Sequence, residues 1–366
     1  MREAQISSQQ FALLLCLFNS FAQVLILPQP MAKAAGTDAW LAGLAGIALG
    51  TVPISIPLGL LARRHPTMGF GEVAEFALGK WPGRLALLLV AAISLFLTSL
   101  VIRNIVDFSA IALLPGTPSL VIGLLFALST CYAAYAGSEV ITRLAVLVIM
   151  LTLVGMSVVI VGTLAEVDLT RIQPWFVHGI SPIMRGAWPT TGWFAEFLVL
   201  GPFIFQINRP AKATKSMLWG NFLAGLLLTI LVALSILVFG VQLTEKFTYP
   251  VYALSRQISL GQFLERLEII VITIWLSGML VKAASTLWAA TCCLTWSLGL
   301  PQWKWLPLLL GAVAFWLSLL WHSELEQAWF STHYWTPYML PFFFGLPLLM
   351  LLGSYWRMRH RKGVSA

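Results

Sequence analysis

Four ionisable side chains lie inside long apolar stretches of the sequence: Arg103, Asp107, Glu196 and Lys282. A charged group within a bilayer costs about 2.5–3.5 kcal/mol on insertion scales, so it generally faces a cavity or an oppositely charged partner. Arg103 and Asp107 are four residues apart, which places both on one face of a helix. This spacing predicts either a self-contained ion pair near the outer end of the helix or a gate toward the exterior.

Glu196 and Lys282 have residue types suited to binding a charged ligand. Glu196 is expected near a break in a helix, where its carboxylate could hold a ligand's ammonium or a cation; alternatively, it bonds the broken helix ends. Lys282 lies midway along an apolar stretch, with Ser285 and Thr286 one turn later. Its ammonium could replace a transported cation, pair with Glu196, or extend toward the cytoplasm.

Enzymatic chemistry is not predicted. The sequence has no HExxH motif, no nucleophile elbow and no GxxxxGK[ST] phosphate loop. Its histidines fall in loops or at the ends of apolar stretches, so we expect no catalytic residue, no metal site and no cofactor. The cysteines lie inside apolar stretches without CxxC spacing and are interpreted as small core residues: Cys16, Cys131, Cys292 and Cys293.

The composition indicates that these residues sit in lipid. Of 366 residues, 59% are hydrophobic and 10% are charged, whereas a soluble domain has about 25% charged residues. The net charge of +8 could suggest nucleic acid. However, the basic run 357–362 follows an apolar stretch directly, as in a cytoplasmic membrane flank. The expected partner is therefore a bilayer, and no nucleic acid is expected.

The apolar stretches are long enough to form about ten membrane-spanning helices. A spanning helix needs about 20 mostly apolar residues. Most lysines and arginines of the connections fall on the side of both termini, which predicts that the termini are cytoplasmic. Short helices are expected at Gly71–Leu78 and Val251–Ile258. The predicted spans are roughly 9–33, 38–62, 82–113, 118–136, 141–164, 187–207, 216–241, 267–298, 305–322 and 337–357.

The spans form one integral membrane domain, 1–366, which we divide into two halves. The expected repeats are about 9–164 and 187–357, followed by a cytoplasmic tail, 358–366. Spans one and six each begin a block of five and contain polar residues and prolines: LFNSFAQVLILPQP and WPTTGWFAEFLVLGPFIFQINRP. Interrupted helices at corresponding positions favour an inverted-repeat transporter fold with a midplane site. Simple proline kinks are the alternative.

A longer segment carries a family resemblance. The stretch TYPVYALSRQISLGQFLERLEIIVITIW, residues 248–275, contains a GxFxERxE block at the start of span eight. It resembles the signature of the spore germination receptor B-subunits, the endospore germination permease family. The segments PQPMAKAAGTDAW, GKWPGR and RIQPWFVHGISPIMRGA support the same resemblance.

The resemblance implies a fold, a location and partners. That family is similar to the amino acid, polyamine and organocation transporters, so it implies an all-α, leucine-transporter-like 5+5 inverted repeat with broken helices 1 and 6. Family members sit in the inner spore membrane with a membrane A-subunit and a lipoprotein C-subunit, and sense germinants such as amino acids. The expected function is therefore a germinant-sensing subunit. A secondary amino acid transporter and a scaffold without its own ligand are the alternatives.

By analogy with that fold, the ligand is expected between spans one, three, six and eight. Many family members have a Gly-x-Gly-like segment in span one where this chain has Phe21, Ala22 and Gln23, and this bulk would shrink the pocket. The Trp-rich stretches near 303–305 and 329–335 are expected at the membrane interface. The predicted ligand-binding residues are Phe21, Ala22, Gln23, Leu97, Val101, Gly192, Trp193, Glu196, Lys282 and Thr286.

Overall fold

The computed structural model describes residues 6–114, 116–257, 267–301, 304–321, 326 and 329–364. Most of the GxFxERxE block, in 258–266, and Ile258 of the predicted short helix lie outside the described residues. In the described part the chain is helical, and its β-type pairing is one isolated bridge between Ile6 and Ile207.

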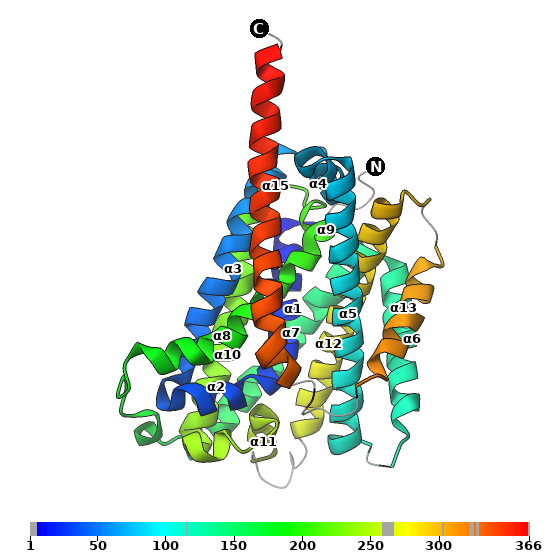
Figure 1. Ribbon diagram of the computed structural model, residues 1–366. Helices are drawn as coiled ribbons and strands as arrows, with labels where there is room; N and C mark the ends of the chain where they lie inside the picture. Colours follow the sequence, from blue (N-terminus) through cyan, green and yellow to red (C-terminus); the bar gives the residue numbers. More distant parts are fainter. Residues whose placement is uncertain are drawn as a thin grey trace.

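The helices form one bundle with both chain ends on the same side (Figure 1). The first half contains α1 (Ser8–Ile26), α2 (Pro28–Ala35), α3 (Ala39–Arg64), α4 (Phe70–Leu78), α5 (Lys80–Ala112), α6 (Ser119–Ala136) and α7 (Ser138–Thr163). The second half contains α8 (Ile180–Ala195), the 3₁₀ segment η4 (Glu196–Leu200), α9 (Gly201–Ile204), α10 (Ala213–Thr244), α11 (Pro250–Gln257), α12 (Leu267–Leu298), α13 (Leu306–Ser318), the π-helical turn η7 (Ser331–Trp335) and α15 (Thr336–Val364).

Each of the ten predicted spans coincides with one or more of these helices. Among the described residues, eight helices are long and apolar enough to cross a membrane, and α13 is a shorter apolar helix. Span six is divided into α8, η4 and α9, and none of these three pieces is long enough to cross a membrane alone. The predicted short helices are present as α4 and α11. The described part of the predicted cytoplasmic tail, 358–364, is helical and continues α15, which projects beyond the bundle (Figure 1). Its cytoplasmic location stays a prediction.

Span one breaks next to a proline, whose nitrogen gives the backbone no hydrogen-bond donor, whereas span six breaks at a change from α to 3₁₀ geometry. α1 ends at Ile26 and α2 restarts at Pro28, so Phe21–Gln23 are helical and the break lies beyond them. In span six, α8 ends at Ala195 and the chain tightens into η4 before Gly201 and Pro202 begin α9. Span six therefore breaks directly at Glu196, as expected.

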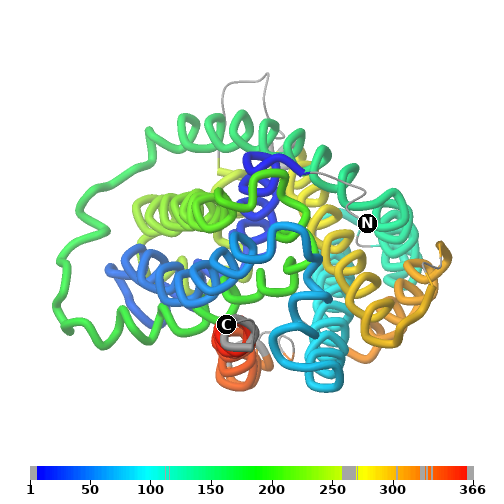
Figure 2. Tube along the Cα trace, turned by 90° about the horizontal axis from the view of Figure 1, so that it is seen from above, coloured from blue at the N-terminus to red at the C-terminus, as the bar shows by residue number. Residues whose placement is uncertain are grey.

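α1 occupies the interior of the bundle and is more buried than most spans. It packs against α10, α7 and α12, while α5 lies along α12 and α3 lies along α8 and α10. The view along the bundle shows α15 and the α6–α13 pair at the periphery (Figure 2). Residues of α1, α5, α12 and the broken span six are thus brought together in the middle.

At the end of the bundle that carries the termini, α15 packs against α3 and α4. The Nε2 atom of His65, just after α3, lies 2.7 Å from the Ser354 hydroxyl, and the His65 ring packs on Phe76 at 5.1 Å between centroids. Burial, and secondarily the neighbouring Arg64 guanidinium, lower the pKa of His65 below its usual value. This contact therefore favours the neutral imidazole.

His65 predicts acid sensitivity of the folded state. Because the pKa of His65 is lower in the folded protein than in an unfolded chain, where it is about 6.5, the neutral ring stabilises the folded state above that pH. This stabilisation is lost as the pH falls through the lower pKa of the folded state. We expect the midpoint of thermal unfolding to fall between pH 7.5 and pH 5 by a larger amount in the wild type than in His65→Gln. Equal acid-induced losses in the two proteins would show that His65 does not contribute.

Candidate functional site

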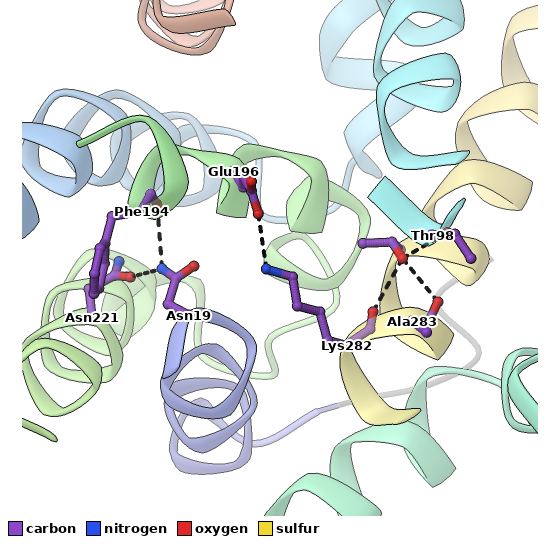
Figure 3. A network of polar contacts seen from close by, with 8 residues as sticks. Asn19, Thr98, Phe194, Glu196, Asn221, Lys282 and Ala283 are labelled. Atoms are coloured by element: carbon purple, nitrogen blue, oxygen red, sulfur yellow. Dashed lines mark hydrogen bonds and ion pairs between the residues drawn. The ribbon is translucent and has the colours of Figure 1, made fainter. Parts of the chain in front are cut away.

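The centre of the bundle contains a buried ion pair between Lys282 of α12 and Glu196 of η4. The Lys282 Nζ lies 2.9 Å from the Glu196 Oε2, and the side chains are 2% and 5% exposed. Figure 3 shows the two side chains extending toward each other from opposite helices. This geometry is that of a charge-assisted hydrogen bond, which is about twice as strong as a neutral one.

Both partners are positioned by local backbone features. Glu196 is the first residue of η4, so the end of α8 fixes where its carboxylate lies. Lys282 lies within the long helix α12, and its ammonium also stands 4.6 Å from the centre of the Phe18 ring of α1. A cation over an aromatic face is stabilised by about 0.5–2 kcal/mol. The ion pair and the ring together give the lysine charge two partners inside the bundle.

A hydroxyl pair links α12 to α5 next to this centre. The Thr286 and Thr98 hydroxyl oxygens are 2.8 Å apart, and Thr286 follows Lys282 by one turn, as predicted (Figure 3). The prediction for α5 named Leu97 and Val101, which are both buried in the main hydrophobic core. Thr98, between them, makes the polar contact and was missed because helical spacing alone does not give the rotation of α5.

A second polar cluster joins α1, α8 and α10. The Asn19 Nδ2 donates to the Asn221 Oδ1 at 2.5 Å and to the Phe194 carbonyl at 3.4 Å (Figure 3). Both asparagines are fully buried. Asn19 is recognisable in the sequence as a polar residue within span one, whereas Asn221 lies 202 positions away and gives no sequence signal of this pairing.

Among the predicted residues of α1, Phe21 contacts α12. The Phe21 carbonyl accepts a hydrogen bond from the Trp275 indole at 2.7 Å, and the Phe21 ring packs on Gly278. This ring lines an apolar cavity of about 20 Å³ whose walls include neither Glu196 nor Lys282. Such a cavity has room for about one water molecule. Phe18, one turn earlier, is the aromatic residue of α1 that contacts the cation.

Gln23 and Ala22 are buried on α1, and neither Gln23 amide atom has a hydrogen-bond partner. Trp193 is half-buried and packs against the main core. Gly192 lies so close to Thr336 of α15 that a Cβ on the glycine would be 2.3 Å from the Thr336 Oγ1. A larger residue at 192 would therefore push α8 away from α15.

The end of η7 contributes a residue that the sequence did not identify as part of a site. Trp335 is 3% exposed and stacks on Phe96 of α5, with ring centres 5.7 Å apart. Its indole lies close enough to the Glu196 carboxylate to interact with it. The interfacial position expected for 329–335 is therefore wrong for Trp335. Tryptophan is common at membrane interfaces, so its presence in a sequence does not by itself reveal a buried role.

Arg103 and Asp107 form the expected ion pair on α5. The Arg103 Nη2 is 2.8 Å from the Asp107 Oδ1, and the Nη1 donates to the Trp321 carbonyl beyond α13 at 2.5 Å. The Arg103–Asp107 contact is the ion pair that the sequence predicted. The hydrogen bond from Arg103 to the Trp321 carbonyl connects α5 to the end of span nine. The gating role stays a prediction.

Together, the ten spans, the two broken helices and the buried central pair define a multi-pass membrane protein with a leucine-transporter-like fold. The structure is similar to Mhp1, a nucleobase-cation-symport-1 family transporter solved in a closed conformation (TM-score 0.65, 16% identity, 89% of this chain and 74% of that chain). It is also similar to a Na⁺-coupled sialic acid symporter in an outward-open state (TM-score 0.67, 14% identity, 95% and 79%). At these identities the likeness concerns the fold alone.

The sequence comparisons identify the family. Residues 5–325 match the family described as spore germination protein, and the chain belongs to this family, that of the germination receptor B-subunits. Two relatives come from Bacillus subtilis (strain 168). Spore germination protein KB is 27% identical over 296 residues, covering 79% of this chain and 78% of that protein. Spore germination protein YndE is 25% identical over 368 residues, covering 98% and 99%.

The buried pair predicts a large difference between single and double substitutions. Lys282→Met leaves Glu196 buried without its counter-charge, so we expect the free energy of unfolding to fall by about 3–5 kcal/mol. In Lys282→Met/Glu196→Gln the uncompensated charge is gone, and most of the loss should be recovered. Thermal unfolding in detergent measures both effects.

The exposed pair Arg143–Glu139 of α7 provides a matched control, with side chains 68% and 53% exposed. Arg143→Gln should cost less than about 1 kcal/mol, because water screens an exposed pair. A double variant at the centre that is no more stable than Lys282→Met would contradict the importance of charge pairing there.

Proposed function

We propose that this chain is the germinant-sensing subunit of a spore germination receptor and that it binds a small nutrient such as an amino acid between α1, α5, α12 and the broken span six. The observation that carries the proposal is the Glu196–Lys282 pair, which places two opposite charges at a helix break in the middle of a transporter-like fold. Such breaks are where transporters of this architecture bind charged ligands. The family membership gives the biological context.

The proposed site keeps the predicted residues and extends them. Glu196 and Lys282 supply the charges, and Thr286 adds a hydroxyl one turn from the lysine. Leu97, Val101, Trp193, Phe21 and Ala22 remain proposed apolar walls, Gln23 remains a proposed polar contact, and Gly192 allows close packing. Thr98, Phe18 and Trp335 join them on the contacts described above.

Binding would act through a change of conformation. A sensor without a catalytic group can only bias an equilibrium that a partner protein detects. The proposed partners are the membrane A-subunit and the lipoprotein C-subunit, in the inner spore membrane. Cytoplasmic termini are also proposed. This orientation is supported by the start of α1 and the end of α15, which lie on one side of the bundle (Figure 1), and by the lysines and arginines that the sequence predicts on that side.

The proposal predicts a shifted germinant response. In spores whose only copy of this subunit carries Glu196→Gln, the amino acid concentration for half-maximal germination should rise at least about tenfold, equivalent to about 1.4 kcal/mol. Arg63→Gln, an exposed change at the end of α3, should leave that concentration unchanged. An unaltered response in Glu196→Gln at normal protein level would remove Glu196 from the binding site.

The alternative is a secondary amino acid transporter, which the likeness to symporters favours. Counterflow with radiolabelled amino acids in proteoliposomes separates the two functions. A sensor should bind without accumulating label above protein-free vesicles. Robust uptake by the purified chain alone would instead establish transport.

A further inference from the structure

We infer that an anionic phospholipid binds at the end of the bundle that carries the start of α1 and the end of α15, with its headgroup phosphate held by Lys80 and Arg357. The site lies at the corner between α4 and α5, where α15 passes. It shares no residue with the Glu196–Lys282 centre and does not depend on the proposed function.

The segment GKWPGR forms this corner, and the central ion pair does not involve it. Gly79 has a φ of +105°, a left-handed conformation that favours glycine. Gly83 lies so close to α4 that a Cβ there would be 2.8 Å from a carbonyl oxygen of that helix. Arg84 pairs with Glu75 of α4 at 2.7 Å. These three residues of the segment therefore build the corner.

Lys80 and Trp81 of the same segment take no part in building the corner. Both are exposed, and the exposed fraction of Trp81 is 77%. Indole rings favour the headgroup layer of a membrane, and a lysine at the end of a membrane helix extends its ammonium toward that layer. This pair of residues is therefore typical of an anchor among lipid headgroups.

α15 brings a second cation to the corner. The Arg357 Nη2 lies 3.1 Å from the position that a Cβ on Gly79 would take, directly before Lys80. One turn earlier on α15, Gly353 packs so tightly on α4 that a Cβ there would collide with the Ala77 carbonyl. Helix packing thus fixes Arg357 beside the start of α5, although the two segments are distant in the sequence.

The corner lies at the level at which helices of the bundle end (Figure 1). α3 ends and α5 begins there, and the His65–Ser354 contact places α15 at the same level. Trp356, next to Arg357, is 64% exposed. Because Trp81 and Trp356 both favour the headgroup layer, the neighbouring cations lie among lipid phosphates rather than in bulk water.

The positive charge of this corner has no counter-charge from the protein. The two carboxylates of α4 are already engaged, because Glu75 pairs with Arg84 and Glu72 accepts a hydrogen bond from a backbone N–H at 2.8 Å. Within the described part of the chain, no carboxylate lies at ion-pair distance from Lys80 or Arg357. The corner therefore presents two uncompensated cations to the headgroup layer.

An anionic phospholipid supplies the missing negative charge. A guanidinium matches phosphate oxygens with two parallel hydrogen bonds, and an adjacent ammonium adds a second attraction. Basic pockets between membrane helices bind anionic headgroups in this way. A zwitterionic headgroup carries its own cation beside the phosphate and offers no net charge. The two exposed tryptophans favour lipid over an acidic protein as the occupant.

The first test measures thermal unfolding of the purified full-length wild-type chain in detergent. The chain is titrated with phosphatidylglycerol or with phosphatidylcholine of identical acyl chains, because a lipid that binds the folded protein raises the unfolding midpoint. Phosphatidylglycerol should act at a half-maximal concentration at least about tenfold lower than phosphatidylcholine, since two cations contribute. Added salt should reduce this difference because it screens exposed charges.

Three results in the wild type would overturn the inference. The first is equal half-maximal concentrations for the two lipids. The second is an equal rise of the midpoint with inorganic phosphate at the same concentration, which would make the site one for free phosphate. The third is a rise with poly-L-glutamate but none with phosphatidylglycerol, which would assign the corner to an acidic protein.

Lys80→Gln tests the cation of α5. It should raise the half-maximal phosphatidylglycerol concentration about fivefold, the contribution of one basic residue near an anionic surface. It should leave the midpoint without lipid unchanged, because the Lys80 side chain is exposed. The matched control is Arg143→Gln, which removes an exposed cation that has its own partner in Glu139. This control should leave the lipid response unchanged.

The double variant Lys80→Gln/Arg357→Gln tests whether the two cations form one site. It should respond alike to phosphatidylglycerol and phosphatidylcholine. An unchanged lipid preference in Lys80→Gln, or an equal loss of preference in Arg143→Gln, would reject the site. A double variant that still prefers phosphatidylglycerol as strongly as the wild type would place the lipid elsewhere on the protein.

Discussion

A charge buried away from water must have a partner, and this constraint organises the centre of the molecule. Glu196 and Lys282 are 86 positions apart within the second half of the chain, and each is tolerable in the interior only because of the other. Their 2.9 Å contact requires that η4 and α12 keep one relative position. The Phe18 ring of α1 also contacts the Lys282 ammonium, so η4, α12 and α1 are held together around the charged pair.

The broken backbone of span six is acceptable because it lies inside the protein. In a bilayer, irregular backbone is tolerated only where protein or a polar cavity surrounds it, and every residue of η4 is buried. The Phe194 carbonyl near this break accepts from Asn19, whose amide also bonds Asn221. The polar cluster of α1 and α10 and the ion pair of α12 therefore support the same break from two sides.

The sequence was sufficient for the features that depend on local chemistry. Apolar length predicted the spans, prolines predicted that spans one and six are broken, and the cost of charge in lipid singled out Glu196 and Lys282. It was insufficient where the rotation of a helix decides. The contacts of Phe18 with the Lys282 cation and of Thr98 with Thr286 were not predicted, because packing against distant segments sets how α1 and α5 are turned.

The closed centre has a contact at each end that a change of conformation must break. Toward the termini, the chain before α1 is joined to the segment after α9, since Ile6 donates to the Gln206 carbonyl at 3.1 Å and accepts from the Asn208 N–H at 2.9 Å. On the other side, Phe96 stacks on Trp335 beside Glu196. Two backbone hydrogen bonds and one aromatic contact are each worth only about 0.5–1.5 kcal/mol. The central pair costs more to break unless both charges find other partners, so it is the largest of these three barriers to a change of conformation.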